Sequence, residues 1–209
     1  DRTAVVPVGA DEALFTHQPA QARRDGRLQV LFYGSFIDLQ GPEMIARAAV
    51  MCHEVDWVML GDGPLRSRCE RIARGHEHVR FEPWLTYADL PGRIGQADLL
   101  LGVFSDSDKA GRVVPNKVYQ AMACGRPVVT RRPLPGAYPW DTNQPSSDVN
   151  GLCFVEPGDP STIAQAVQQL ARDPQQLGQM GAEAAKTFQR YFSQAQIRHH
   201  LEALLARIG

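Results

Sequence analysis

The stretch that decides the fold is PNKVYQAMACGRPVV, which runs from Pro115 to Val129. Its first residues indicate a loop, and the apolar spacing that follows is that of a short helix. Gly125 stops the helix, and the apolar residues after it indicate a buried strand. The polar side chains lie before the helix or on it, where such a unit presents them to a ligand. The stretch therefore predicts one unit of an architecture in which helices and strands alternate.

The same alternation extends on both sides of this stretch. The predicted strands are Leu28–Gly34, Val55–Gly61, Val79–Trp84, Asp98–Phe104, Arg126–Thr130 and Gly151–Val155. The predicted helices between them are Pro42–Met51, Leu65–Arg74, Tyr87–Gln96 and Asn116–Cys124. Near-continuous apolar strands indicate burial on both faces of a sheet, and crossovers between parallel strands are right-handed. The sequence thus predicts an α/β fold: a Rossmann-like, doubly wound parallel sheet of about six strands that is flanked by helices.

Both ends of the chain depart from this pattern. After Asp159, a predicted helix N-cap, only helical patterns follow, and they predict a helical C-terminal tail. Its helices are expected at about Pro160–Arg172, Pro174–Phe192 and Ser193–Ile208. We expect one domain over residues 1–209, with residues 1–27 as a linker, first strand and flexible loop and residues 160–209 as the C-terminal helices. In the first part, Val5–Gly9 reads as a short strand or linker, and Gln18–Gly26 reads as a polar loop.

Composition excludes several classes of protein. Lys and Arg number 22 against 23 Asp and Glu, so the net charge of -1 argues against a nucleic-acid partner bound by bulk charge. No apolar run approaches the roughly 20 residues of a transmembrane helix. The four widely spaced cysteines fit buried thiols in a reducing compartment. We therefore expect a cytoplasmic protein, and because the chain begins with Asp1 rather than methionine, we expect it to be part of a longer one.

In an open parallel sheet, ligands bind beyond the carboxyl ends of the strands. The first strand leads into a helix through the loop Gly34–Gly41. This loop and the helix N-terminus could cradle a phosphate, or the loop could be an ordinary turn. The second leads into Gly61–Pro64, which suits either close approach of a ligand or a tight turn. The third is followed by Trp84, which could border a nucleobase or belong to the core. Neither a dinucleotide-binding fingerprint nor a P-loop is present.

The fourth strand is followed by the richest loop. Lys109, Arg112 and Lys117 place three cations within nine residues, beside the start of a predicted helix. Cations at that end oppose the helix dipole, and a bound phosphate would resolve the conflict. The alternative is that these side chains are solvated or pair with Asp106 and Asp108.

The histidines give little indication of a metal. His199 and His200 are neighbours on a predicted helix and cannot face one ion. His76 and His78 flank a predicted turn, which makes only a weak case for a metal. No metal site is predicted.

With these residues in place, the chain resembles the carboxy-terminal, donor-binding half of a GT-B glycosyltransferase of the group 1 family, glycosyltransferase family 4. The resemblance covers about Val5 to Gly209, and the order and spacing of its motifs make it specific. The motifs are Phe32-Tyr33-Gly34, Gly61-Asp62-Gly63-Pro64, Val79-Arg80-Phe81, Ala97-Asp98, Pro115–Val129 and Pro157-Gly158-Asp159.

The resemblance implies one half of a GT-B fold that binds a nucleotide-diphospho-sugar, with UDP- and GDP-sugars expected first. It implies sugar transfer with retention and without a tightly bound metal or cofactor, in glycan or polysaccharide biosynthesis. The acceptor, which is expected to be a glycan, a lipid-linked molecule or a small molecule, would bind an amino-terminal half that this chain lacks. That half could also hold the protein at a membrane surface. This chain alone is therefore expected to bind donor without turning it over.

Compared position by position, the family's charged residues are exchanged in this chain. Two glutamates of the family, separated by seven residues, fall on Arg112 and Gln120, and a basic pair falls on Ser35 and Gln40. Gln120 can still hydrogen-bond to a ribose, whereas Arg112 can only donate and would seek a phosphate or carboxylate. We therefore predict that phosphate neutralisation has moved from the first loop to Arg112, Lys117 and Lys109.

The candidate site divides into three regions, according to the part of the donor that each would bind. Donor and phosphate binding are assigned to Ser35, Phe36, Gln40, Gly41, Lys109, Arg112, Val113, Val114, Asn116 and Lys117, and ribose binding is assigned to Gln120. The nucleobase region is assigned to Gly61, Asp62, Gly63, Pro83, Trp84 and Leu85. No catalytic residue is assigned. A non-catalytic nucleotide-sugar-binding domain and a GT-B-type nucleotide-sugar epimerase remain as alternatives, since the exchanged acids could also mark a site that has lost catalysis.

Overall fold

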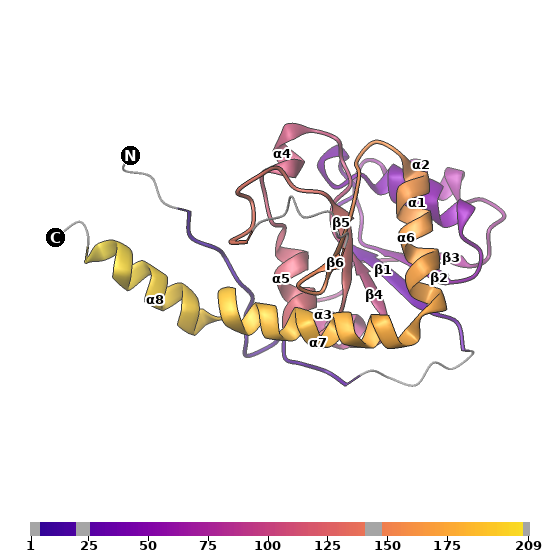
Figure 1. The fold of residues 1–209 in the computed structure, drawn as a ribbon. Helices are drawn as coiled ribbons and strands as arrows, with labels where there is room; N and C mark the ends of the chain where they lie inside the picture. Colours follow the sequence, from indigo (N-terminus) through magenta and orange to yellow (C-terminus); the bar gives the residue numbers. More distant parts are fainter. Residues whose placement is uncertain (1–4, 20–25, 141–147, 207–209) are drawn as a thin grey trace.

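Seven strands form one sheet in the order β3-β2-β1-β4-β5-β7-β6, with helices on both sides (Figure 1). The structure, a computed structural model, describes residues 5–19, 26–140 and 148–206. Six strands are parallel: β1 Gln29–Tyr33, β2 Asp56–Leu60, β3 Val79–Glu82, β4 Leu99–Leu101, β5 Val128–Arg131 and β7 Leu152–Val155. The predicted parallel sheet is confirmed. The two-residue strand β6, Asp148–Val149, pairs antiparallel with β7 and is too short to leave a pattern in the sequence.

The helices follow the predicted alternation. They are α1 Pro42–Met51, α2 Arg66–Ile72, α3 Leu90–Gly95, α4 Asp108–Gly111, α5 Asn116–Ala123, α6 Pro160–Arg172, α7 Pro174–Tyr191 and α8 Gln194–Leu205, with a 3-10 turn η1 at Asp38–Gln40. The predicted bounds of α1 and α6 are confirmed, because each begins at a proline and α6 is capped by Asp159, whose carboxylate accepts from the N–H of Ser161 at 2.8 Å.

The structure corrects or narrows the sequence-based predictions at three places. Helix α3 begins three residues later than predicted, because Pro91 fits the first turn of a helix and breaks its interior. Val5–Gly9 forms no strand in the described part of the chain. The four-residue helix α4, capped by the hydroxyl of Ser107, was not predicted. Most of the expected polar loop Gln18–Gly26 lies outside the described residues.

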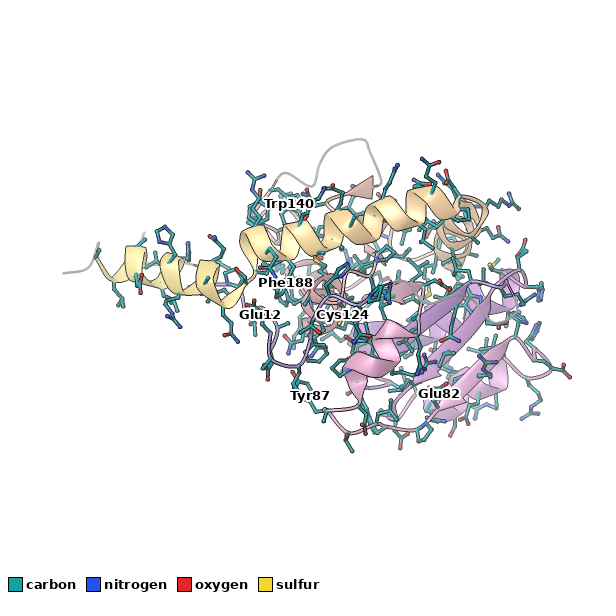
Figure 2. All side chains as sticks on the ribbon, turned by 90° about the horizontal axis from the view of Figure 1, so that it is seen from below. Glu12, Glu82, Tyr87, Cys124, Trp140 and Phe188 are labelled. Atoms are coloured by element: carbon teal, nitrogen blue, oxygen red, sulfur yellow. The ribbon has the colours of Figure 1, made fainter. Side chains whose placement is uncertain are left out.

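The sheet is buried on both faces, which explains why its strands are continuously apolar. Side chains alternate along β1, so that Val30 and Phe32 enter one core while Leu31 and Tyr33 enter the other. Helices α1, α2 and α6 cover the first face. Helices α3, α5 and α7 cover the second, and Figure 2 shows Phe188 of α7 within it.

The four cysteines, Cys52, Cys69, Cys124 and Cys153, are all buried and free, as expected. Burial raises the pKa of the Cys69 thiol to about 12, so this group stays protonated at neutral pH. None of the described helices is long and apolar enough to cross a membrane.

The carboxyl ends of β1 and β2 approach each other closely. The N–H of Gly34 donates to the carbonyl of Leu60 at 3.0 Å, and Gly61 follows directly with φ 122°. A Cβ at Gly61 would overlap the carbonyl oxygen of Gly34. Residue 61 therefore has to be glycine for both loops to keep their positions.

This contact predicts a difference between two glycine substitutions. Gly75 also has a positive φ, 83°, but a Cβ there would meet nothing within 4 Å. Gly75→Ala should cost about 1 kcal/mol of unfolding free energy through backbone strain alone. Gly61→Ala should cost about 2–3 kcal/mol, because overlap with backbone adds to that strain. Urea unfolding measures both, and equal losses would contradict the packing of these loops.

Candidate functional site

The sheet topology places the candidate site between β1 and β4. From β1 the chain continues to β2 and β3 on one side, and β4 then pairs with β1 on the other, so strand order reverses here. Crevices at such points are where open α/β sheets bind ligands. The N–H of Phe104, beyond β4, donates to the carbonyl of Gln40, in the loop after β1, at 3.1 Å. The first and fourth strand exits, both predicted to bind phosphate, are therefore in contact.

Lys117, on the first turn of α5, is at the centre of this contact. Its Nζ donates to Oε1 of Gln40 at 2.8 Å and lies 4.1 Å from the ring centroid of Phe32. The side chain is only 7% exposed, and no carboxylate among the described residues forms an ion pair with it. Burial holds the pKa of Lys117 well below its usual value, because the ammonium has lost most of its water. The site thus contains a buried lysine amine with no compensating carboxylate among the described residues.

The end of β1 is shaped around this lysine. A Cβ at Gly34 would overlap the amide of Gln40 and lie 2.9 Å from the Lys117 Nζ. The hydroxyl of Tyr33 is directed at Oε1 of Gln120, at 2.8 Å, and at the carbonyl of Lys117, at 3.2 Å. Strand β1 therefore contacts both the side chain of Lys117, through Phe32, and its backbone carbonyl, through Tyr33.

Unpaired backbone donors surround the start of α5. Pro115 is its N-cap and supplies no side-chain cap, and Asn116 is exposed. In the described part of the chain, the N–H groups of Val113 and Val114 have no acceptor. Together with the positive end of the helix dipole, these donors favour an anion beside Lys117.

The other two predicted cations are exposed. Arg112 pairs with Asp108 at 3.3 Å, which is one of the pairings that the sequence left open. Both side chains are mostly exposed, so the ion pair contributes little to the stability of the fold. Arg112 can therefore turn towards a ligand at little cost. Lys109 lies on α4 and is exposed as well. The three cations therefore do not form one surface cluster, since Lys117 is buried.

Arg131, at the end of β5, orders the loop after β4. This buried guanidinium donates to the carbonyls of Ser105 at 2.7 Å and Ser107 at 2.8 Å. The sequence did not indicate this residue, because an arginine at the end of a strand usually reaches solvent. It acts as a positioning residue for the loop that carries Arg112.

Gln120 lies one turn after Lys117 on α5. Its Oε1 accepts from Tyr33, and its Nε2 lies 3.4 Å from the hydroxyl of Tyr87, which is exposed (Figure 2). Gln120 is buried, so a ribose would meet Tyr87 together with it. Sequence reasoning missed Tyr87, and ribose binding by Gln120 remains a prediction.

The predicted nucleobase region forms the neighbouring loops. The turn after β2 is tied to the first loop by the N–H of Phe36, which donates to the carbonyl of Asp62 at 2.9 Å. The carboxylate of Asp62 accepts from the N–H of Gly63 at 2.7 Å. After β3, the side chains of Trp84 and Leu85 are exposed, so the alternative that Trp84 belongs to the core is wrong.

The remaining predicted residues of the first loop differ in what they can offer. Phe36 packs its ring against Phe32 in the core, at a centroid distance of 5.6 Å, so it can contribute only backbone groups. Ser35 is half-buried and Gly41 is buried. Pro83 is exposed beside Trp84.

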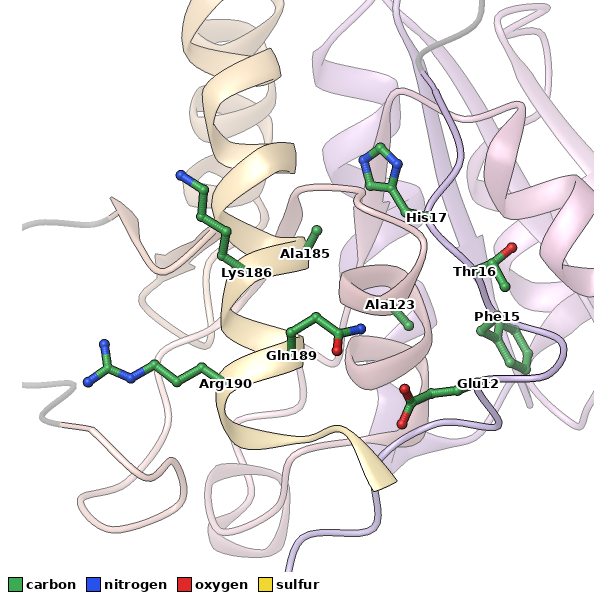
Figure 3. A pocket seen from close by; sticks show the side chains of 9 residues that line it. All are labelled: Glu12, Phe15, Thr16, His17, Ala123, Ala185, Lys186, Gln189 and Arg190. Atoms are coloured by element: carbon green, nitrogen blue, oxygen red, sulfur yellow. The ribbon is translucent and has the colours of Figure 1, made fainter. Parts of the chain in front are cut away.

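Two hollows of the surface differ in their relation to this site. One of about 360 Å³ is lined by Gly41, Phe104 and Ser105, at the edge of the site. A larger one, of about 680 Å³, lies between residues 12–17, the end of α5 and α7 (Figure 3). It contains Ala123, at the opposite end of α5 from Lys117. The larger hollow is therefore separate from the candidate site around Lys117.

Comparison with known proteins agrees with this geometry. A family model described as "Glycosyl transferases group 1" matches residues 27–173. The chain belongs to this family. No curated protein shows significant sequence similarity to it.

Solved structures of the same fold include proteins from several bacteria. Anabaena Alr3699/HepE, in complex with UDP and glucose, has a TM-score of 0.78 at 19% identity, over 98% of this chain and 57% of its own. Sucrose-phosphate synthase from Thermosynechococcus elongatus has a TM-score of 0.72 at 18% identity, over 97% and 52%. The C-terminal domain of LpcC from Francisella tularensis has a TM-score of 0.68 at 17% identity, over 89% and 100%. This chain thus spans a little over half the length of HepE and all of an isolated C-terminal domain.

The buried lysine predicts that binding and stability oppose each other. Lys117→Met should leave the Tm of the free protein at pH 7 unchanged or higher, because burying the charge is costly. The variant should also lose any rise in Tm that an added nucleoside diphosphate produces in the wild type. Differential scanning fluorimetry measures both. Lys186→Met is the control, since the exposed Lys186 pairs with Glu183 beside the larger hollow. A nucleotide-induced rise in Tm that disappears only in Lys186→Met would contradict a site at Lys117.

The lowered pKa of Lys117 also predicts how the free energy of unfolding depends on pH in the wild type and in Lys117→Met. Between the pKa of Lys117 in the folded state and about 10.5, its usual value, the unfolded chain binds more protons than the folded one. The stability contribution of residue 117 should therefore rise with pH over that window in the wild type and not in Lys117→Met. Urea unfolding at several alkaline pH values measures it, and parallel curves would contradict it.

Proposed function

We propose that the chain is the donor-binding domain of a glycosyltransferase that moves a sugar from a nucleotide-diphospho-sugar to an acceptor. The observation that carries the proposal is the buried ammonium of Lys117, which no carboxylate among the described residues compensates. It lies at the strand-order reversal, beside unpaired N–H groups at the start of α5. A diphosphate supplies the negative charge that this arrangement lacks.

The position of Lys117 supports the proposed movement of charge. The family resemblance assigns a lysine to position 40, where this chain has Gln40. The Nζ of Lys117 reaches the Gln40 side chain at 2.8 Å, so this chain has an amino group beside position 40 although residue 40 itself is uncharged. Arg112, held only by an exposed ion pair, would add a second cation. These two groups would stabilise the charge that grows on the departing nucleoside diphosphate as the sugar–oxygen bond breaks.

The neighbouring loops would hold the nucleoside. Tyr87 and Gln120 would meet the ribose, and exposed Trp84 and Leu85 would flank the base. Structures of HepE contain UDP, glucose and UDP-glucose, which supports a UDP-sugar as the donor. Because cationic side chains and N–H groups would neutralise the phosphates, we propose that no tightly bound metal or cofactor takes part.

The rest of the enzyme would supply the acceptor site. We propose an amino-terminal half that binds a glycan, lipid-linked or small-molecule acceptor, with retention of configuration, in cytoplasmic glycan or polysaccharide biosynthesis. Helix α8 has no buried residue, and its Leu201 and Leu205 are exposed. It would pack on that half, which could hold the protein at a membrane surface. The chain alone would bind donor and not turn it over.

A non-catalytic nucleotide-sugar-binding domain is the second candidate. Arg112 stands where the family has a glutamate that touches the donor sugar, and an arginine cannot accept a hydrogen bond from it. Both candidates require donor binding. Sugar transfer by the full-length protein separates them.

A thermal-shift screen tests the ligand class. Nucleoside diphosphates at 100 times their dissociation constant should stabilise the chain by about 2.7 kcal/mol. Uridine, guanosine, adenosine and thymidine diphosphates identify the base, and the matching nucleosides without phosphate serve as controls. We expect UDP to stabilise most and uridine hardly at all. Equal stabilisation by uridine and UDP would contradict a phosphate-centred site.

A matched pair of arginines tests the second cation. Arg172, like Arg112, is exposed and pairs weakly with an acid, Glu54 at 3.9 Å, but it lies at the end of α6. Arg112→Ala should weaken UDP binding by about tenfold to a hundredfold, the value of a charge-assisted hydrogen bond. Arg172→Ala should leave it unchanged, and Asp62→Ala should have a smaller effect. Unchanged affinity of Arg112→Ala in isothermal titration calorimetry would remove Arg112 from the site.

A further inference from the structure

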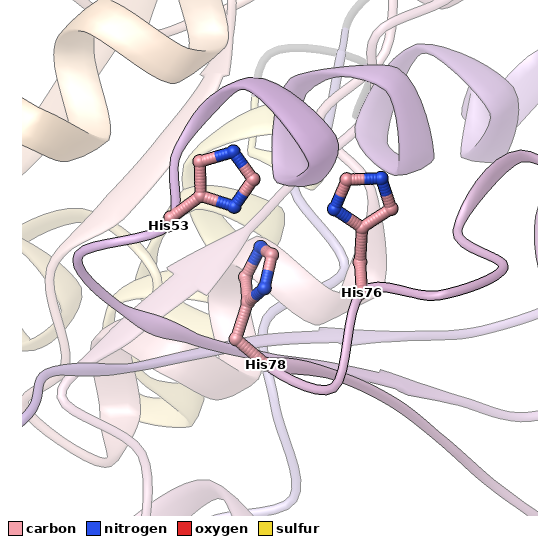
Figure 4. Close-up of side chains that lie close together, drawn as sticks. All are labelled: His53, His76 and His78. Carbon is pink, nitrogen blue, oxygen red and sulfur yellow. The ribbon is translucent and has the colours of Figure 1, made fainter.

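Three histidines lie together at the edge of the sheet opposite the donor site. His53 comes from the connection between α1 and β2, and His76 and His78 come from the connection between α2 and β3. Each offers a ring nitrogen, and these atoms all lie within 4.8 Å of one another (Figure 4). They are the only metal-compatible group of three or more such side chains that the described residues form. The sequence indicated His76 and His78 weakly and gave no sign of His53, more than twenty residues earlier.

The arrangement of the rings fits one shared ion. Their centroids are separated by 4.7 Å for His53 and His78, 5.4 Å for His53 and His76, and 5.7 Å for His76 and His78. Imidazoles bound to one tetrahedral zinc at about 2.0 Å place their centroids about 5 Å apart. In Figure 4 the three rings surround a common space, with ring nitrogens directed into it. A shared ion requires side-chain rotations that bring the three nitrogens, now within 4.8 Å of one another, to its bonding distance.

The hydrogen bond of His78 prepares its other nitrogen for a metal. Nε2 of His78 lies 2.9 Å from the carbonyl oxygen of Ala49. A carbonyl can only accept, so Nε2 carries the hydrogen, and in the neutral ring Nδ1 keeps a free electron pair. A bond from the second ring nitrogen to a backbone carbonyl is the usual support of a histidine that binds a metal.

The backbones of all three residues are held in place. The carbonyl of His53 accepts from the guanidinium of Arg27 at 2.6 Å. The carbonyl of His76 accepts from Val79 at 3.0 Å, and that of His78 accepts from Trp57 of β2 at 2.8 Å. His53 is exposed and the other two are half-buried, so an ion and its water can reach the site from solvent.

We propose that His53, His76 and His78 form a binding site for a divalent transition-metal ion, with zinc as the best fit and water completing a tetrahedron. Three neutral nitrogen ligands suit zinc, copper and nickel, and zinc accepts the geometry without electronic strain. The ion would clamp the α1–β2 connection to the α2–β3 connection. This proposal is independent of the donor site, because the histidines precede β2 and β3 while the donor site lies beyond the opposite ends of the strands.

Titration calorimetry with zinc chloride on chelator-stripped protein tests the site. The wild type should bind one zinc ion per chain and gain thermal stability in zinc. His53→Gln and His76→Gln should each weaken binding by about tenfold or more. The double variant His199→Gln/His200→Gln, which changes exposed histidines of α8, should bind as the wild type does. Wild-type affinity in both His53→Gln and His76→Gln would overturn the proposal.

Two further measurements separate ligand loss from misfolding. His53→Gln changes an exposed side chain, so its Tm in EDTA should equal that of the wild type, and its response to UDP should be unchanged. X-ray absorption of the zinc-loaded wild type should show three imidazole nitrogens at about 2.0 Å. A spectrum with only one imidazole ligand would likewise overturn the site. So would a loss of stoichiometric zinc binding in the His199→Gln/His200→Gln variant.

Discussion

The buried ammonium of Lys117 is the interaction on which the candidate site depends. Its direct partners among the described side chains are the amide oxygen of Gln40 and the rings of Phe32 and Tyr33, and none of them supplies a negative charge. Gly34 leaves room for this pair, and Tyr33 holds the carbonyl of Lys117. A cation in such surroundings costs folding free energy, which selection retains where function requires it. An anion that enters the site would offset that cost.

The position of the lysine follows from the topology. Strand order reverses between β1 and β4, so the loops after both strands open at one point, and the bond from Phe104 to Gln40 holds them together. Helices on both faces keep the sheet buried, so polar groups gather at its ends. At the carboxyl ends they form the candidate site around Lys117. At the amino ends of β2 and β3 they include the three histidines.

Local patterns in the sequence predicted most of the fold. The six parallel strands were predicted because both of their faces are buried, and the bounds of α1 and α6 followed from Pro42 and Pro160. Four residues of α4 and two of β6 are too few for a pattern. The site around Lys117 was predicted as a set of loops, but its bond between Lys117 and Gln40 joins distant positions. The separate histidine cluster likewise joins His53 with His76. No local spacing encodes such contacts, and whether a charge is buried or exposed emerges only from packing.

The most direct measurement is the pKa of the Lys117 ammonium, followed by NMR through its ¹³Cε resonance in free and UDP-saturated protein. The account predicts a pKa well below the usual lysine value in the free protein, caused by burial, and a marked rise when the diphosphate compensates the charge. The lysine Nζ should also become protected from exchange with solvent. An identical pKa in the free and saturated protein would contradict the claim that this buried cation binds the donor phosphates.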